Sequence, residues 1–266
     1  MPISGIFGQR IRITSLVSLQ SIGTQHIRAT LTHSTPQLVS SRRAILGKQT
    51  EPSLVMFSGG RDSTLAALRL HLAGAPVTMV TVTSSHLVGI ESVRQRLTEL
   101  SHYLPADTRW LQVRQPKELR TDTSFYEQTC LPCHHAYVVA SVVLAGLLGA
   151  RRLAFGYAGY QMNWPEQTPL AVARLAHVLR RYDVVLELPV YDIASRAAAI
   201  AELERFGLSS DSLEQKCLRQ VTNVTLPEAQ LREQIGLWEA AIDRSMQALN
   251  SIEVEIIAEA ILGSLV

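Results

Sequence analysis

The chain has 266 residues, of which 47% are hydrophobic and 18% are charged. This balance excludes a wholly disordered or fibrous chain, and the length allows one large domain with a substantial core. The 25 basic and 23 acidic residues leave a formal net charge of +2, which gives no general argument for nucleic-acid binding, and three cysteines are too few for a disulfide framework.

The N-terminal segment, residues 1–50, differs from the rest because it contains basic residues and no acidic ones. Apolar and polar residues alternate over 10–17 and 26–31, which predicts a β-hairpin around 21–25. A mobile basic extension is the alternative. The composition also fits an organellar transit peptide, but the alternation favours sheet over an amphipathic helix. No secretory signal is recognisable, so we predict a cytoplasmic protein without membrane association.

From residue 53 onward, buried strands alternate with helices. This order is typical of a doubly wound α/β fold, here with a mainly parallel five-stranded sheet. We therefore predict a central α/β domain over 51–225 and a helical C-terminal extension over 226–266. The predicted strands are 54–57, 77–83, 109–113, 152–155 and 184–188. The predicted helices are 62–72, 90–103, 134–148, 170–181, 195–206, 227–249 and 252–265.

The helix predicted at 134–148 is unusually apolar. It is too short to span a bilayer and is therefore interpreted as a buried core helix.

The strongest signal lies between the first predicted strand and the first predicted helix. Two glycines there let the backbone approach an anion closely, and the free N–H groups and dipole of the helix N-terminus favour negative charge. The loop lacks the Gly-Lys-[Ser/Thr] ending of a Walker A motif. A glycine-rich turn capped by Ser and Asp is the alternative interpretation. The residues are Ser58, Gly59, Gly60, Arg61, Asp62, Ser63 and Thr64.

This loop resembles the pyrophosphate loop (PP-loop) of the N-type ATP pyrophosphatases, whose pattern is Ser-Gly-Gly-x-Asp-Ser. The resemblance implies an adenine nucleotide alpha hydrolase-like (HUP) fold. It also implies an enzyme that transfers AMP from ATP to a carbonyl or carboxylate oxygen and releases pyrophosphate. Asp62 and Ser63 would be catalytic, with Asp62 near a Mg²⁺–pyrophosphate. ATP would be bound by Ser58, Gly59, Gly60, Arg61, Asp62, Ser63, Thr64, Thr81 and Gly156.

A second resemblance lies downstream, where Gly149 to Gly156 is followed by Trp164-Pro165-Glu166-Gln167-Thr168-Pro169. These segments are similar to 7-cyano-7-deazaguanine synthases, the PP-loop enzymes of queuosine precursor synthesis. The resemblance implies a deazapurine substrate, attacked by ammonia or another amine, including one on a protein. Tyr160, Trp164, Glu166 and Gln167 would then bind the base. That family has Asp-Cys-Arg at Glu166 to Thr168 and a four-cysteine zinc cluster where this chain has only Cys217.

The cysteines form a Cys-x2-Cys pair, Cys130 and Cys133, and a distant Cys217. One interpretation is a zinc site with His134 as the fourth ligand, which the deazaguanine-like segments favour. The second is a [4Fe–4S] cluster on three thiolates, a pattern similar to one group of PP-loop tRNA thiolases. The third is three small buried hydrophobic residues. Thiols at a helix N-terminus are also expected to have lowered pKa values, which would suit a redox pair or a persulfide carrier.

The sequence thus predicts an ATP-dependent ligase acting on a deazapurine-type base. A tRNA sulfurtransferase, with tRNA as partner, is the alternative, and a non-catalytic nucleotide-binding subunit is the second. A homodimer is compatible with each of these functions. His86 is interpreted as a surface histidine, and Asp192 and Arg196 as an exposed pair.

Overall fold

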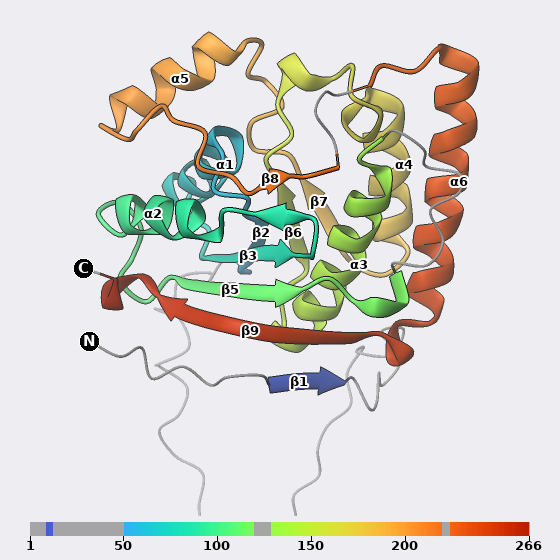
Figure 1. Ribbon diagram of the computed structural model, residues 1–266, viewed down its shortest axis with the longest axis horizontal. Helices are drawn as coiled ribbons and strands as arrows, with labels where there is room; N and C mark the ends of the chain where they lie inside the picture. Colours follow the sequence, from blue (N-terminus) through green and yellow to red (C-terminus); the bar gives the residue numbers. More distant parts are fainter. Residues whose placement is uncertain (1–8, 13–50, 120–128, 220–223, 266) are drawn as a thin grey trace, which may run out of the picture.

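The computed structural model describes residues 9–12, 51–119, 129–219 and 224–265. These residues form an α/β fold around a seven-stranded sheet in the order β1-β9-β5-β3-β2-β6-β7 (Figure 1). The predicted α/β class is therefore confirmed. Most of residues 1–50, including the second strand of the predicted hairpin, lies outside the described residues.

The centre of the sheet is parallel. It consists of β2 (Ser53–Met56), β3 (Val77–Thr83), β5 (Arg109–Arg114), β6 (Arg152–Phe155) and β7 (Val185–Glu187). β2 pairs with β3 on one side and with β6 on the other. The chain therefore changes direction across the sheet at β2, and a parallel sheet leaves a crevice beyond the strand ends at such a point. The five predicted parallel strands are all present.

The C-terminal edge differs from the prediction. Residues 253–261 form strand β9 (Glu253–Ile261), which pairs antiparallel with β5 and, on its other side, with β1 (Gln9–Arg12). The helix predicted over 252–265 is wrong. The segment is rich in β-branched residues, and β5 offers an open edge whose arginines bind β9 through Arg109–Glu259 and Arg114–Glu255 ion pairs.

Helices cover both faces of the sheet (Figure 1). One hydrophobic cluster joins a face to α1 (Arg61–Leu72), α2 (Ile90–Leu100) and α5 (Arg196–Arg205). Another joins the opposite face to α3 (Leu131–Leu148), α4 (Pro169–Arg180) and α6 (Glu228–Gln247). The arrangement is doubly wound, as predicted. A separate two-stranded ribbon pairs β4 (Leu87–Val88) with β8 (Lys216–Cys217).

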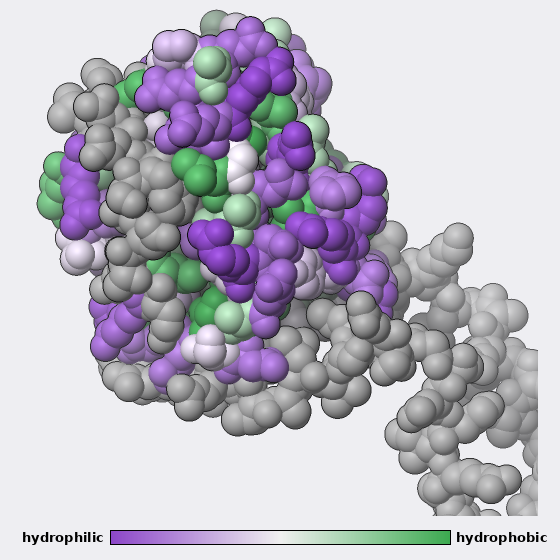
Figure 2. Space-filling view, turned by 90° about the vertical axis from the view of Figure 1, so that its right-hand side faces the viewer, coloured by the Kyte–Doolittle hydropathy of each residue, from purple (hydrophilic) through white to green (hydrophobic). Residues whose placement is uncertain are grey.

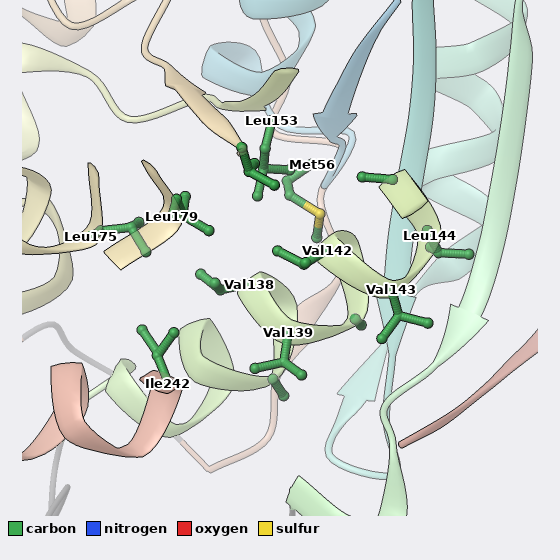
Figure 3. Close-up of a cluster of buried hydrophobic side chains, with 14 of the residues drawn as sticks. Met56, Val138, Val139, Val142, Val143, Leu144, Leu153, Leu175, Leu179 and Ile242 are labelled. Atoms are coloured by element: carbon green, nitrogen blue, oxygen red, sulfur yellow. The ribbon is translucent and has the colours of Figure 1, made fainter. Parts of the chain in front are cut away.

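The apolar helix α3 lies in the core. Its residues Val138 and Val142 lie among Met56 of β2, Leu179 of α4 and Ile242 of α6 (Figure 3). α3 has 18 residues and could cross a membrane by length and composition, so the prediction that it is too short is wrong, but 61% of it is buried in the fold. The helix thus has the position of the buried core helix that the sequence predicted.

One face of the molecule is mostly polar where the structure describes it. Figure 2 shows the side that lies to the right in Figure 1. Hydrophilic residues predominate there, and hydrophobic ones occur in small separate groups. Scattered apolar residues of this kind are normal for a globular surface.

Candidate active site

Hydrogen bonds to hydroxyl groups within the loop between β2 and α1 hold its conformation. Gly59 has a φ of +83°, which favours glycine, and a Cβ there would lie 2.7 Å from the carbonyl oxygen of Leu213. Ser58 N–H donates to Ser63 Oγ over 3.2 Å, and Thr64 Oγ1 donates to the carbonyl of Gly60 over 2.7 Å. These bonds hold the loop in one shape at the start of α1, where helix N–H groups favour anions.

Gly156, at the end of β6, touches the start of α1. A Cβ on Gly156 would lie only 2.5 Å from the backbone nitrogen of Ser63. Only glycine lets the two backbones approach so closely. This contact brings the carboxyl end of β6 to the phosphate loop, as the resemblance implied.

Asp62 lines the pocket at the phosphate loop, and hydrogen bonds from Tyr160 hold its carboxylate. Tyr160 Oη donates to both carboxylate oxygens, over 2.7 Å to Oδ2 and 3.0 Å to Oδ1. Burial raises the pKa of Asp62 from its ordinary value, while the Tyr160 bond and Arg61 act in the opposite direction. The bond also raises the pKa of Tyr160, after burial as the larger cause. Tyr160 is therefore a positioning group for the Asp62 carboxylate.

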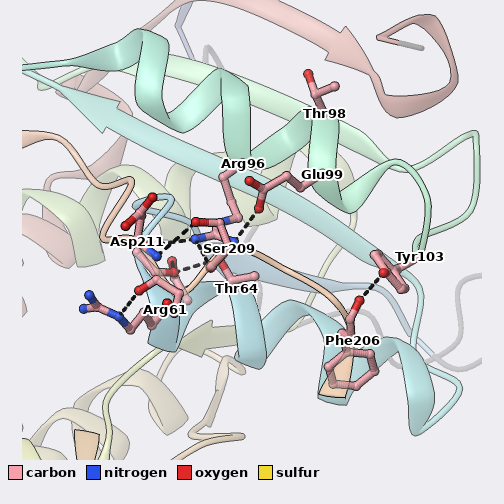
Figure 4. Close-up of polar contacts among 12 residues, drawn as sticks. Arg61, Thr64, Arg96, Thr98, Glu99, Tyr103, Phe206, Ser209 and Asp211 are labelled. Atoms are coloured by element: carbon pink, nitrogen blue, oxygen red, sulfur yellow. Dashed lines mark hydrogen bonds and ion pairs between the residues drawn. The ribbon is translucent and has the colours of Figure 1, made fainter. Parts of the chain in front are cut away.

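The segment 208–215, which we call the covering loop, packs onto the phosphate loop. Arg61 Nε donates to the carbonyl of Ser210 over 2.7 Å. Arg96, which is fully buried, donates to the carbonyls of Ser209 and Asp211 over 2.9 and 2.8 Å (Figure 4). Two arginines thus tie the covering loop to α1 and α2, although nothing in its local sequence indicates that role.

Glu214 of the covering loop brings a second carboxylate to the phosphate loop. A Cβ on Gly60 would lie 2.7 Å from Glu214 Oε2. Ser212 Oγ donates to Glu214, and the negative charge of Glu214 raises the pKa of Asp62 further. Carboxylates beside a phosphate site are the ligands Mg²⁺ uses together with phosphate oxygens. Asp62 and Glu214 therefore fit a Mg²⁺–nucleotide.

One pocket of about 730 Å³ extends from the phosphate loop to the start of α3. The predicted residues that line it are Ser58, Gly60, Arg61, Asp62, Ser63, Thr81, Cys130, His134, Gly156, Tyr160, Trp164 and Gln167. Those outside its lining are Gly59, Thr64, Cys133, Glu166 and Cys217. Lining residues that the sequence did not single out include Tyr137, Ser212, Glu214 and Gln215.

The expected Asp192–Arg196 pair is not formed. Asp192 instead binds Arg69 over 2.5 Å. Arg196, at the start of α5, lines the pocket and lowers the pKa of Asp62 through its charge. The interpretation of Arg196 as half of an exposed pair is wrong.

The far wall of the pocket combines aromatic rings with buried polar groups. Tyr137, Tyr157 and Trp164 line it. Gln167 is 5% exposed, and its Oε1 has no hydrogen-bond partner. A buried carbonyl oxygen without a partner costs free energy, so this atom suits a donor on a ligand.

Glu166 lies outside the pocket lining and next to His134, which lines the pocket. His134 Nδ1 is 2.6 Å from Tyr157 Oη, and His134 Nε2 is 3.9 Å from Glu166 Oε1. Burial raises the pKa of Glu166 to about 7 and lowers the pKa of His134 to about 4. Because both shifts favour the neutral forms, the two side chains do not form an ion pair near neutral pH.

The cysteines come together from distant segments. Cys130 and Cys133 begin α3, and Cys217 lies in β8, whose pairing with β4 places Cys217 opposite Leu87. Cys133 and Cys217 interact electrostatically, and burial raises the pKa of Cys133 to about 11, opposite to the direction expected from the helix N-terminus. The structure therefore brings the Cys-x2-Cys pair near the third cysteine.

The structure does not join His134 to the cysteines, because its ring contacts Tyr157. His86 takes that place instead: its Nε2 lies 3.3 Å from Cys133 Sγ. The interpretation of His86 as a surface histidine is wrong. Within the described ranges, no three His, Cys, Asp or Glu side chains are grouped to hold a single metal ion. Cysteine thiolates are the ligands that hold iron–sulfur clusters, so Cys130, Cys133 and Cys217 offer the right type of donor, although they are not grouped around one point.

Comparisons with known proteins show the fold. No family model matches the chain, and no curated protein matches its sequence. A 4-thiouridine synthetase, solved with RNA and bound ATP, is similar in structure, with 16% identity, a TM-score of 0.52 and coverage of 78% of this chain. This chain covers 55% of that synthetase, so it spans about half of the relative's length.

Two further structures are less similar. NMN synthetase from Francisella tularensis is 11% identical, with a TM-score of 0.46 and coverage of 74% of this chain and 87% of its own. The U34-tRNA thiolase NcsA from Methanococcus maripaludis, solved with its [4Fe–4S] cluster, is 15% identical, with a TM-score of 0.42 and coverage of 76% and 73%. The similarity to the 4-thiouridine synthetase alone shows the fold of this chain, the adenine nucleotide alpha hydrolase-like fold that the loop implied.

Proposed function

We propose that this protein is a cytoplasmic ATP pyrophosphatase that transfers AMP to an oxygen of a nucleobase and replaces that oxygen with sulfur. The observation that carries the proposal is the pocket itself. It has the phosphate loop at one end and Cys130, at the start of the cysteine pair, at the other. A base that reacts with ATP at the loop would therefore lie within reach of the cysteine end.

The chain's own residues have distinct parts in this reaction. The helix N-terminus and the hydroxyls of the phosphate loop stabilise the charge that develops as pyrophosphate leaves. Asp62, oriented by Tyr160, and Glu214 would hold Mg²⁺ with the phosphates. The aromatic residues would stack on the base, and Gln167 Oε1 would accept a hydrogen bond from it.

The cysteines Cys130, Cys133 and Cys217 would hold a [4Fe–4S] cluster. A cluster held by three thiolates supplies an iron atom without a protein ligand, which can bind sulfide. The predicted fourth zinc ligand, His134, contacts Tyr157, while His86 lies 3.3 Å from Cys133 Sγ, so metal analysis decides between the cluster and a zinc ion. With the cluster, the substrate would be a tRNA.

Amination of a deazapurine remains the second candidate. It is favoured by the buried pair Glu166 and Gln167 beside the aromatic wall, which resembles the base-binding segment of the deazaguanine synthases. In that case an amine displaces AMP, and the cysteines have a structural role.

One experiment separates the candidates. Anaerobically purified protein is analysed for iron, sulfide and zinc and then given ATP with either tRNA and sulfide or 7-carboxy-7-deazaguanine and ammonia. We expect pyrophosphate release and a thiolated nucleoside only with tRNA, and loss of thiolation in Cys130→Ser. Turnover with the deazapurine would instead support the second candidate. No pyrophosphate with either substrate would indicate a nucleotide-binding subunit.

A further inference from the structure

Two of the described arginines line the pocket, and they differ in what their side chains bind. Arg61 is engaged by the covering loop, because its Nε donates to the carbonyl of Ser210 and its Nη1 donates to Ser212 Oγ. Arg196 is exposed, and its guanidinium makes no hydrogen bond or ion pair with the residues that the structure describes. Arg196 is therefore the lining cation whose donors are available to a ligand.

The backbone that carries Arg196 is held in place at the phosphate-loop end of the pocket. Tyr160, which binds the Asp62 carboxylate, donates its backbone N–H to the carbonyl of Ile193 over 3.1 Å. Ser195 caps α5, since its Oγ accepts a backbone N–H of the first turn over 3.1 Å. α5 in turn packs against α1 (Figure 1). The segment that positions Tyr160 and Asp62 thus also positions the start of α5.

The charge of Arg196 acts on that end of the pocket without being consumed there. Burial raises the pKa of Asp62, and the charges of Arg61 and Arg196 act in the opposite direction. Both oxygens of Asp62 already accept hydrogen bonds from Tyr160, and Arg196 forms no ion pair with them. The guanidinium is thus close enough to influence the carboxylate and still has its donors available for an anion.

We propose that Arg196 is a catalytic residue whose guanidinium binds oxygens of the β- and γ-phosphates of ATP and remains bound to the pyrophosphate as it leaves. This inference rests on the proposed function, because it requires cleavage between the α- and β-phosphates. The planar guanidinium can donate two parallel hydrogen bonds to phosphate oxygens. Asp62 and Glu214 bring two negative charges to the same end, so a cation there offsets repulsion of the polyphosphate.

The step has a simple balance of bonds and charge. An oxygen of the base attacks the α-phosphorus, and the bond from that phosphorus to the bridging oxygen breaks. The electron pair of the broken bond leaves with pyrophosphate. Arg196 keeps its protons throughout and stabilises the negative charge that develops on the leaving group.

The first test measures binding and needs no nucleobase substrate. The full chain is titrated calorimetrically, in the presence of Mg²⁺, with ATP, inorganic pyrophosphate or AMP. We expect Arg196→Ala to bind ATP and pyrophosphate about tenfold more weakly, because charged hydrogen bonds are lost, and to bind AMP as the wild type does. Arg196→Lys, which keeps the charge but not the paired donors, should lie between them. Arg205→Ala, at an exposed position of the same helix, is the matched control and should bind all three like the wild type.

The second test measures turnover. With the nucleobase substrate, kcat for pyrophosphate release should fall at least about tenfold in Arg196→Ala, because the contact strengthens as charge develops on the leaving group. Circular dichroism of the variant should match that of the wild type.

Two results would overturn the role of Arg196. One is wild-type affinity of Arg196→Ala for ATP and pyrophosphate. The other is an equal loss of affinity for AMP, which would place the contact away from the leaving group. A wild-type protein that binds neither ATP nor pyrophosphate would refute the ATP pyrophosphatase function itself, so the two failures are distinguishable.

Discussion

The two ends of the pocket differ in how their polar groups are satisfied. At the phosphate-loop end, Ser58, Ser63 and Thr64 bond within the loop, and Asp62 accepts two bonds from Tyr160. At the other end, Gln167 Oε1 has no partner. The first end is preorganised by the chain alone, as transition-state charge stabilisation requires. Under the proposed function, the second end would select the substrate.

The largest effect is expected at the preorganised end. Asp62→Asn keeps the size of the side chain and a carbonyl that accepts from Tyr160, but it removes the charge proposed to hold Mg²⁺–pyrophosphate. Because one such group contributes on the order of 10²–10³ in rate, we expect pyrophosphate release to fall by about that factor. Steady-state assays of pyrophosphate and circular dichroism of the variant check this.

Asp192→Asn is the matched control for that change. Asp192 also forms a short contact to its partner, Arg69, but is 70% exposed and lies outside the pocket lining. Its loss should leave the rate within about twofold, as expected for an exposed ion pair. Equal activity of Asp62→Asn and wild type would mean that Asp62 takes no part in the reaction.

A pair of glycine variants tests how closely the backbones approach at this end. Gly156→Ala places a methyl group 2.5 Å from Ser63 N, so we expect a loss of about 1–3 kcal/mol and weaker ATP binding. Gly146→Ala in α3 meets nothing within 4 Å and should stabilise the helix by about 0.5–1 kcal/mol. Urea unfolding measures both. Equal stabilities would mean that β6 does not need to touch α1.

The substrate end should respond more weakly and only toward the base. Gln167→Leu removes an acceptor that has no partner among the described residues. We expect the KM for the base substrate to rise about tenfold, as one buried hydrogen bond contributes roughly 1–3 kcal/mol, while the KM for ATP stays unchanged. Gln234→Leu is the control, because its Oε1 is also buried without a partner but lies in α6, outside the pocket lining. A change in the KM for ATP alone would contradict the division of the pocket into a phosphate-loop end and a substrate end.

The same contrast explains what the sequence could predict. The phosphate loop is one contiguous stretch between a buried strand and a helix, so Ser58 to Thr64 could be recognised without tertiary information. The substrate end is assembled from segments far apart in the chain. Arg196, Glu214 and His86 have no local signal, although His86 follows the end of β3, where the carboxyl ends of parallel strands converge.

Strand β9 was misread for a related reason. Glu253, Glu255 and Glu259 give the segment a polar, helix-compatible composition, whereas its β-branched residues and the open edge of β5 with its arginines favour a strand. Tertiary context of this kind overrides local propensity. The proposed base-binding residues follow the same pattern: the aromatic-Pro-Glu-Gln segment could be noticed in the sequence, but its position facing Cys130 across one pocket could not.

The smallest effect on activity, but a clear one on stability, is expected for Glu166 behind the substrate wall. Burial raises its pKa from 4.5 to about 7, so between these values the folded state binds more protons than the unfolded state. The free energy of unfolding therefore falls as pH rises from about 4.5 to about 7, by roughly 3 kcal/mol at most, at about 1.4 kcal/mol per pKa unit.

Glu166→Gln removes this dependence, and His134, whose shift acts below pH 6.5, remains the same in both proteins. Urea unfolding should thus show similar stabilities at pH 5 and a more stable variant at pH 8, whereas Glu204→Gln, at an exposed position of α5, should follow the wild type at both. A constant difference between Glu166→Gln and wild type at all pH values would mean that the pKa of Glu166 is the same in the folded and the unfolded protein.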